Sequence, residues 1–438
     1  MKTLLHKLAL ISFGMMLLLW GCSAGPRQMM PTPNIYLNKA HDSYHDLHPD
    51  LKSTEVRLFF ITDRAPEKDE EGKLQYGYER SASLAFGDVV VDLGANLTWE
   101  DLLEASRTQK RLKPVELKLG QINEHIRTPK TPFPYKLVDG QIVEDPSWVE
   151  QGRQAAEAFQ KDLVQQLAKT SRKEIFIYIH GYRNTFKDAA FAMAELWHFL
   201  GRIGVPIIYT WPAGYPGLFG YTYDRESSEF TVYHLRKVLK FMATFPEIDK
   251  IHVIAHSRGT DVATATLREL TIEMRAKGLD PQQELKIHNF IIAAPDIDLE
   301  VAVQRISGDK IPLSAKRFTI YTSPDDKAIG FARKLFQSPR GRVGTYGPDA
   351  IDEHLRAGLE FGKDNYSVIN FSGASDGFKY RGDKYGHSYF RNAPTVSSDL
   401  VIMLRDDRDP GTPERPLEHL DLNFWKIPPN YPSKMQKD

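Results

Sequence analysis

The stretch that decides the predicted fold is Ile251-His252-Val253-Ile254-Ala255-His256-Ser257-Arg258-Gly259. Its first half is an apolar run with the length of a buried strand, and the residues that follow begin a helical repeat. A serine at a sharp junction of strand and helix adopts a strained backbone, so it needs small residues two positions before and after it. Ala255 and Gly259 occupy those positions. We therefore predict a turn that presents Ser257 as a nucleophile, in preference to an N-cap serine of the following helix.

Similar apolar runs recur on both sides of this turn, separated by amphipathic stretches. In these stretches apolar residues repeat at helical spacing, as in 232–242 and 263–274. Buried strands that alternate with helices predict an α/β fold with a mostly parallel sheet and helices on both faces. An earlier run, 56–61, begins the ordered part of the chain and precedes a polar loop over 63–73. The other runs are 175–179, 206–209, 251–255, 290–294, 318–321 and 368–371.

Composition excludes several classes of protein. The chain has 438 residues, of which 41% are apolar, so a large core is available and disorder is not expected. Acidic and basic residues are equal in number, at 57 each, and no long basic run occurs. The sequence thus lacks the electrostatic footprint of a nucleic-acid-binding protein, and we expect no such partner.

The N-terminus has the pattern of a signal peptide. Lys2 and Lys7 precede an apolar run over 8–20 that is too short to span a bilayer comfortably. The run ends in Leu19-Trp20-Gly21-Cys22, which resembles the bacterial lipobox, and Cys22 is the only cysteine. The resemblance implies diacylation of Cys22 and thus a membrane partner through the lipidated N-terminus. By the same analogy, the absence of aspartate after Cys22 implies the outer membrane of the cell envelope, facing the periplasm.

Four segments follow from this pattern. Residues 1–21 are predicted to be the lipoprotein signal peptide, and the polar residues 22–50 a flexible tether. Residues 51–405 form the α/β domain with an N-terminal extension, and 406–438 a C-terminal tail.

A serine nucleophile needs a base, and a carboxylate to orient that base, expected in the chain order serine, acid, histidine. His387 is the predicted base because it lies on a glycine-bearing loop after the last apolar run. His354 is the alternative, in a charged stretch typical of a solvated helix face.

The acid candidates follow the apolar run 318–321. Asp325 and Asp326 are adjacent there, and the residues alone leave the choice between them open. Asp296 and Asp298, after the preceding run, are interpreted as structural or as shaping the pocket.

Acyl transfer also needs donors for the developing oxyanion, which backbone N–H groups supply in such folds. We predict the N–H groups of Tyr182, after the run 175–179, and of Arg258. His180 is interpreted as fixing its loop, because it lies in a His-Gly turn. It is not the expected base, since it precedes the nucleophile in the chain. The segment 211–223 is rich in glycine and aromatic residues, and two interpretations stay open: a lid or acyl pocket, and aromatics packed on the sheet edge.

From about residue 58 to 404 the chain resembles the alpha/beta-hydrolase family formerly catalogued as domain of unknown function 900, in the esterase/lipase superfamily. The matching pieces are Phe60-Ile61-Thr62-Asp63-Arg64, Tyr178-Ile179-His180-Gly181-Tyr182, Thr210-Trp211-Pro212, Tyr223-Asp224-Arg225-Glu226-Ser227, Ala255-His256-Ser257, Ala294-Pro295-Asp296-Ile297-Asp298, Asp326-Lys327-Ala328 and His387-Ser388-Tyr389. Departures from the family pattern are Arg258-Gly259-Thr260, Arg183 and Ala213.

The resemblance implies the α/β-hydrolase fold and a Ser257-Asp326-His387 triad. It favours cleavage of a carboxylic ester or thioester through an acyl-enzyme on Ser257, with a small-molecule acyl ester or lipid as substrate and no metal or cofactor. Two alternatives stay open: an envelope peptidase or amidase with the same triad, and a noncatalytic surface lipoprotein that keeps the fold.

Overall fold

A large twisted sheet forms the centre of the computed structural model, which describes residues 26–38, 41–217, 219–351, 366–373 and 383–432 and the isolated positions 353, 356 and 360. Within these residues the sheet has eleven strands in the order β12-β13-β11-β10-β9-β8-β6-β7-β1-β2-β3. The central strands are parallel to one another. They are β6 (Glu174–Ile179), β7 (Val205–Thr210), β8 (Lys250–His256), β9 (Ile287–Ala293), β10 (Arg317–Thr322) and β11 (Ser367–Asn370).

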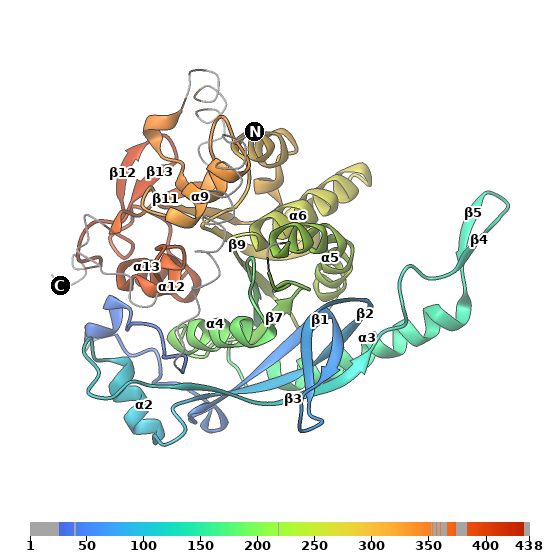
Figure 1. Ribbon diagram of the computed structural model, residues 1–438, viewed down its shortest axis with the longest axis horizontal. Helices are drawn as coiled ribbons and strands as arrows, with labels where there is room; N and C mark the ends of the chain where they lie inside the picture. The colour runs from blue at the N-terminus through green and yellow to red at the C-terminus, as the bar shows by residue number, and fades with distance from the viewer. Residues whose placement is uncertain are drawn as a thin grey trace, which may run out of the picture.

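Helices cover both faces of this sheet (Figure 1). One apolar core joins one face of the strands to α4 (Phe186–Phe199) and α13 (Pro394–Asp406). A second core joins the other face to α3 (Pro146–Leu167), α5 (Gly220–Ala243) and α6 (Gly259–Ala276). Successive strand residues alternate between the two cores, as the pleat requires. The predicted α/β class, with a mostly parallel sheet and helices on both faces, is confirmed.

An antiparallel extension completes one edge of the sheet. It consists of β1 (Glu55–Lys68), β2 (Leu74–Leu93) and β3 (Leu117–Arg127), and β1 pairs in parallel with β7. The prediction of a polar loop over 63–73 is wrong for residues 63–68, because β1 continues to Lys68 and pairs with β2 there. The pairing partner supplies the backbone hydrogen bonds that a local reading of the polar sequence does not anticipate.

The C-terminal residues build the opposite edge and differ from the expected tail. The strands β12 (Glu418–Asp421) and β13 (Phe424–Lys426) extend the main sheet, with β13 parallel to β11. Arg415 is fully buried and forms an ion pair with Asp399 of α13, and the Tyr431 hydroxyl donates to the same carboxylate. The buried charge pair anchors this segment to the domain.

The described part of the predicted tether also lies against the domain. The Met29 N–H donates to the Val115 carbonyl at 2.8 Å, and the Met30 N–H donates to the Glu195 carboxylate at 2.7 Å. Tyr36 and Tyr44 are buried in the core beside α4. Residues 26–38 and 41–50 therefore form an ordered strap, because their apolar side chains cover a face that would otherwise contact water.

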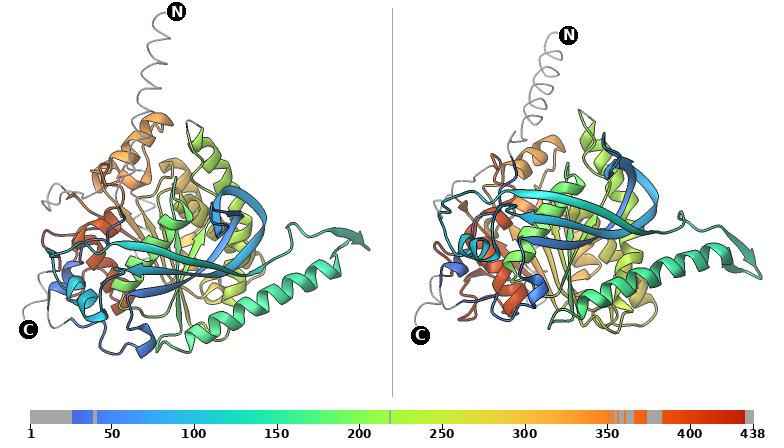
Figure 2. Two further views of the ribbon diagram at one scale, coloured as in Figure 1. Left: turned by 60° about the horizontal axis from the view of Figure 1, so that its bottom comes forward. Right: turned by 90° about the horizontal axis from the view of Figure 1, so that it is seen from below.

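The remaining elements decorate this framework. A hairpin of β4 (Tyr135–Val138) and β5 (Gln141–Glu144) lies at the tip of α3, which extends away from the sheet (Figures 1 and 2). No helix among the described residues has the length and apolar character needed to cross a membrane. The other helices are α2 (Trp99–Ser106), α7 (Pro281–Leu285), α8 (Leu299–Ala302), α9 (Lys327–Leu335) and α12 (Tyr389–Asn392), with shorter turns at Asn34–Leu37, Pro49–Leu51, Val303–Gly308, Ile311–Ser314, Val343–Thr345 and Pro348–Ala350.

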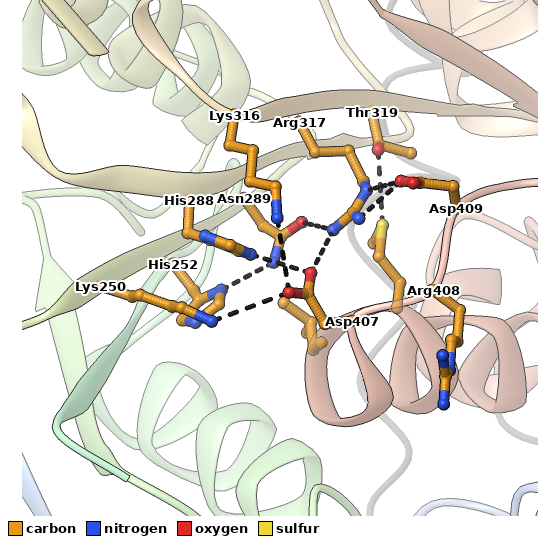
Figure 3. Close-up of polar contacts among 12 residues, drawn as sticks. Lys250, His252, His288, Asn289, Lys316, Arg317, Thr319, Asp407, Arg408 and Asp409 are labelled. Carbon is orange, nitrogen blue, oxygen red and sulfur yellow. Dashed lines mark hydrogen bonds and ion pairs between the residues drawn. The ribbon is translucent and has the colours of Figure 1, made fainter. Parts of the chain in front are cut away.

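A network of charges ties the end of α13 to the amino ends of β8, β9 and β10 (Figure 3). The Asp407 carboxylate contacts His288 at 2.8 Å and Arg317 at 2.9 Å, with Lys250 and Lys316 within 4 Å. Burial disfavours the charged form of the Asp407 carboxyl and so raises its pKa. The hydrogen bonds from His288 and Arg317 outweigh this effect and hold the pKa well below the ordinary value. The network lies at the end of the sheet opposite Ser257.

Replacing Asp407 with asparagine is expected to reduce the free energy of unfolding by about 2–3 kcal/mol, because the surrounding cations lose their shared counter-charge. Asparagine tolerates the left-handed backbone of Asp407, whose φ is +55°, so strain does not confound the result. Asp409→Asn is the matched control, since among the described residues its exposed carboxylate contacts only Arg317 and should contribute less than about 1 kcal/mol. Urea unfolding of both variants measures the difference. Equal losses would contradict the assignment of Asp407 as the centre of the network.

Candidate active site

Ser257 lies on a strained turn between β8 and α6, as predicted. Its φ is +54°, a left-handed conformation that a non-glycine residue rarely adopts. Two glycines make room for the turn. A Cβ on Gly259 would lie 2.2 Å from the His180 carbonyl oxygen, and a Cβ on Gly181 would lie 2.6 Å from the Ser257 Cβ. The close approach of these backbones explains why small residues surround the serine.

His387 lies beside this turn, on a loop that leads into α12. The Asp383 carboxylate accepts hydrogen bonds from the N–H groups of Tyr385 and Ser388, at 3.1 and 2.6 Å, and so shapes the loop. The ring of His387 lies 4.8 Å, centroid to centroid, from the ring of His256, the residue before Ser257. The structure therefore packs the predicted base against His256, the residue before the predicted nucleophile, although 131 positions separate the two histidines in the sequence.

The Asp326 carboxylate contacts the other side of this histidine. Its Oδ2 accepts from His387 Nδ1 at 2.7 Å, and its side chain is fully buried. Its Oδ1 accepts from the N–H groups of Ala328 and Ile329, both at 3.0 Å, and so caps α9. With Nδ1 donating to Asp326, Nε2 is the ring nitrogen that accepts a proton. Asp325 points elsewhere, since its carboxylate accepts from the Ser372 hydroxyl at 2.9 Å.

The charge state of His387 reflects two opposing effects. Burial lowers the pKa of its ring, whereas the Asp326 carboxylate, through charge and hydrogen bond, raises it, and the net result lies above the ordinary histidine value. The carboxylates of Asp383 and Asp296 add to the increase. The imidazolium form is thus favoured at this position.

The two predicted oxyanion donors border Ser257. Tyr182 follows Gly181, whose backbone touches the serine, and Arg258 follows the serine directly. Within the described residues the N–H groups of Tyr182 and Arg258 have no hydrogen-bond acceptor. Two backbone donors left free beside a nucleophile are what an oxyanion hole requires.

The family of the chain agrees with this geometry. Residues 155–405 match a family model described as an alpha/beta hydrolase of unknown function (DUF900). The chain belongs to this family. No curated protein matches the sequence. The match covers more than half of this alpha/beta hydrolase, from α3 to α13, and leaves β1, β2 and β3 outside it.

Asp224 is a buried residue of this hydrolase that lies in the motif Tyr223-Asp224-Arg225-Glu226-Ser227 and has no role predicted from the sequence. Its buried carboxylate accepts from the N–H groups of Arg183, at 2.9 Å, and Gly214, at 3.0 Å. Arg183 has a φ of +58° and directly follows Tyr182, the predicted oxyanion donor. Asp224 thus joins the loop that contains Tyr182 to the loop after β7. Its place in the motif around Tyr223 was the available signal, but the two loops meet only in the folded chain.

Asp296 belongs to a charged group behind the nucleophile. Ion pairs connect it to Arg342 and, at 3.7 Å, to Arg258, and the Tyr221 hydroxyl donates to it at 2.8 Å. Burial would raise the pKa of this carboxyl, but the two guanidinium groups hold it below the ordinary value. Asp298 caps α8 by accepting from the Glu300 N–H at 3.0 Å. These contacts give both aspartates structural roles, in agreement with the prediction that they are structural or shape the pocket.

Trp211 and Tyr221 of the segment 211–223 pack against neighbouring rings, whereas Phe219 is exposed. Trp211 is buried and stacks on His180, with 5.1 Å between ring centroids. Tyr221 lies in the first turn of α5, with its ring between those of Tyr182 and Phe336. The centroid of its ring is 5.0 Å from that of Tyr182 and 4.7 Å from that of Phe336. Cys22 and His354, the remaining residues singled out above, lie outside the described residues.

Proposed function

We propose that this protein is a serine hydrolase that cleaves a carboxylic ester or thioester through an acyl-enzyme on Ser257. The observation that carries the proposal is the strained turn at Ser257, with the ring of His387, which Asp326 holds, packed against the adjacent His256. Strain at a single non-glycine residue is costly and persists mainly at functional sites.

In the first half of the reaction, the Ser257 hydroxyl attacks the carbonyl carbon of the substrate. His387 Nε2 takes the hydroxyl proton, and Asp326 stabilises the resulting imidazolium through Nδ1. The negative charge on the carbonyl oxygen is stabilised by the N–H groups of Tyr182 and Arg258. His387 then protonates the leaving alcohol or thiol as the bond to the acyl carbon breaks.

In the second half, water replaces the leaving group. His387 takes a proton from this water, and the hydroxide equivalent attacks the acyl carbon of the ester on Ser257. The same two N–H groups stabilise the second oxyanion. Collapse of the intermediate returns the proton to the Ser257 oxygen and releases the carboxylic acid, which restores the free enzyme.

Labelling with a fluorophosphonate probe tests this proposal. The probe reacts with an activated serine, so peptide mapping should find it on Ser257, and Ser257→Ala should abolish labelling. A noncatalytic protein would remain unlabelled. A panel of acyl esters of increasing chain length, run beside aminoacyl amides, then separates an esterase from an amidase, and faster turnover of the amides would overturn the ester assignment.

The pH dependence of kcat/KM provides a further prediction. His387 acts as a base only when neutral, so activity should rise with pH as its ring loses a proton. Because Asp326 raises the pKa of His387, the midpoint of this acid limb should lie above 6.5, the ordinary histidine value. Asp326→Asn should move the midpoint of the residual activity to lower pH. A midpoint that is the same in both proteins would mean that another group titrates.

We propose further that Cys22 carries a lipid that anchors the protein to the outer membrane. The charged start, the short apolar run and the sole cysteine support this anchor. When the full chain is expressed in a bacterium that has an outer membrane, Cys22→Ser should release the protein from the membrane fraction or block its processing. A variant that fractionates and migrates like the wild type would refute the anchor, with no consequence for the chemistry at Ser257.

A further inference from the structure

The peptide group between Gly181 and Tyr182 carries the N–H that the proposed oxyanion hole uses, and its carbonyl faces a histidine. We propose that Arg64 and His180 form a positioning pair for this peptide: Arg64 keeps His180 neutral with its proton on Nδ1, and that proton holds the Gly181 carbonyl. The inference rests on the proposed serine hydrolase, and it gives a function to β1, which lies outside the residues matched by the family model.

The hydrogen bonds of His180 determine where its proton resides. Its Nε2 accepts from the Trp211 N–H at 3.1 Å and lies 3.2 Å from an Arg64 guanidinium nitrogen. Both of these groups are donors only, so Nε2 must carry the lone pair. Its Nδ1 lies 2.9 Å from the Gly181 carbonyl oxygen, which is an acceptor only. The ring is therefore neutral with its proton on Nδ1.

Electrostatics supports the neutral form. Burial, followed by the charge of Arg64, lowers the pKa of His180 to about 3. An imidazolium would direct an Nε2 proton at the Arg64 guanidinium and at the Trp211 N–H, which would replace two hydrogen bonds with repulsion. The ring is also stacked on the Trp211 indole with an angle of 8° between the planes, which fixes its orientation.

The planar peptide transmits this constraint to the oxyanion donor. In a trans peptide the C=O and N–H bonds point in opposite directions within one plane. When His180 Nδ1 holds the Gly181 carbonyl, the Tyr182 N–H is therefore directed away from the histidine. Gly181 touches Ser257, so this donor borders the space where the oxyanion forms. The Asn184 N–H also donates to the Gly181 carbonyl, at 3.4 Å.

Arg64 holds the far end of the same loop. It is buried, with 1% of its surface exposed, and its guanidinium donates to the Asn184 carbonyl at 2.8 Å. Further donors reach the Gly77 and Ala213 carbonyls and the Thr210 hydroxyl. Only the planar fork of an arginine offers donors in all these directions, so lysine is not an equivalent replacement. The loop 180–184 is thus held at its start through His180 and at its end through Arg64.

Two substitutions of His180 distinguish the roles of its two ring nitrogens. Asparagine places an amide donor near the position of Nδ1, whereas glutamine places its amide near Nε2. We expect His180→Asn to keep kcat within about tenfold of the wild type. His180→Gln should lower kcat by about 10²–10³, the loss typical of one misplaced oxyanion donor, with little change in KM. Arg64→Lys should likewise lower kcat, with a smaller change in KM.

Thr231→Val is the matched control. Thr231 is equally buried and bonds Asp63, the neighbour of Arg64, but it does not touch the loop 180–184. Thr231→Val should lose as much stability as the His180 and Arg64 variants, as measured by thermal unfolding. It should nevertheless keep the wild-type kcat. If Thr231→Val loses kcat as His180→Gln does, the effect is general destabilisation and the positioning pair is refuted.

A measurement on the unmodified protein completes the test. With ¹⁵N-labelled histidine, nuclear magnetic resonance should show one neutral ring with a protonated Nδ1 and an unprotonated Nε2 that persists from pH 5 to 8, and His180→Asn should remove that signal. An imidazolium or an Nε2-protonated ring at His180 would overturn the inference, as would equal kcat for the asparagine and glutamine variants. Absence of ester turnover in the wild type would instead reject the proposed function, and the ring signals would still decide the state of His180.

Discussion

Replacing either Ser257 or His387 with alanine is expected to abolish nearly all turnover of an activated ester such as a p-nitrophenyl acyl ester. Each single variant should lose on the order of 10⁶ in kcat, because proton transfer and nucleophilic attack are one event. For the same reason the double variant should be barely slower than either single one. The N–H groups of Tyr182 and Arg258 are unaffected by these changes, so a small rate above that of water should remain.

The additivity of these losses decides between two readings of the site. Independent contributions would multiply, and the double variant would then be slower by orders of magnitude. If His387→Ala stays within about tenfold of the wild type, a difference of only about 1.4 kcal/mol in the barrier, His387 is not the base. His354 would then be the histidine to test. Circular dichroism and thermal unfolding of all variants establish that the fold is retained.

The second large effect is expected at the acid. Asp326→Asn should reduce kcat by about 10⁴, since an amide facing His387 Nδ1 favours the wrong tautomer of the ring. The asparagine oxygen can still accept from the Ala328 and Ile329 N–H groups, so the cap of α9 and the stability should be largely kept. The loss would therefore report on the chemistry.

Asp325→Asn provides the control at the adjacent position. Its carboxylate contacts the Ser372 hydroxyl, and an asparagine oxygen accepts the same hydrogen bond, so activity should stay within about tenfold of the wild type. Reversed effects of the two substitutions would assign the acid to Asp325. Equal small effects would exclude both and direct attention to Asp383 and Asp296, the other carboxylates whose charges act on His387.

The β1 strand shows how the N-terminal extension contributes to the site. In β1, the neighbouring residues Asp63 and Arg64 are both fully buried, and each has a separate set of partners. Asp63 accepts from Thr231 at 2.6 Å and lies 2.9 Å from His234, which connects β1 to α5. Arg64 reaches the loop 180–184. The strand pairs with β7, so its register determines where both charges lie.

Local patterns in the sequence sufficed to predict the centre of this protein. The strand runs, the helical repeats and the small residues around Ser257 each reflect constraints within a few residues: the pleat, the helical period and the space needed by a strained turn. The expected chain order of serine, acid and histidine follows from the connectivity of such sheets. The strand runs and helical repeats agree with the family match and with the α/β fold.

Only the tertiary structure decided which distant groups meet. From the residues alone Asp325 and Asp326 were equivalent, and it is the direction of the backbone after β10 that directs one carboxylate to His387 and the other to Ser372. The strap formed by residues 26–38 and 41–50 and the strands β12 and β13 have polar or irregular sequences, and they are ordered because they complete a face or an edge of the sheet. The contact of Arg64 with His180 spans 116 positions, and no local pattern encodes it. The period of apolar residues along a helix or strand indicates which of its sides is buried. Which residues pack against that side depends on the folding of the whole chain.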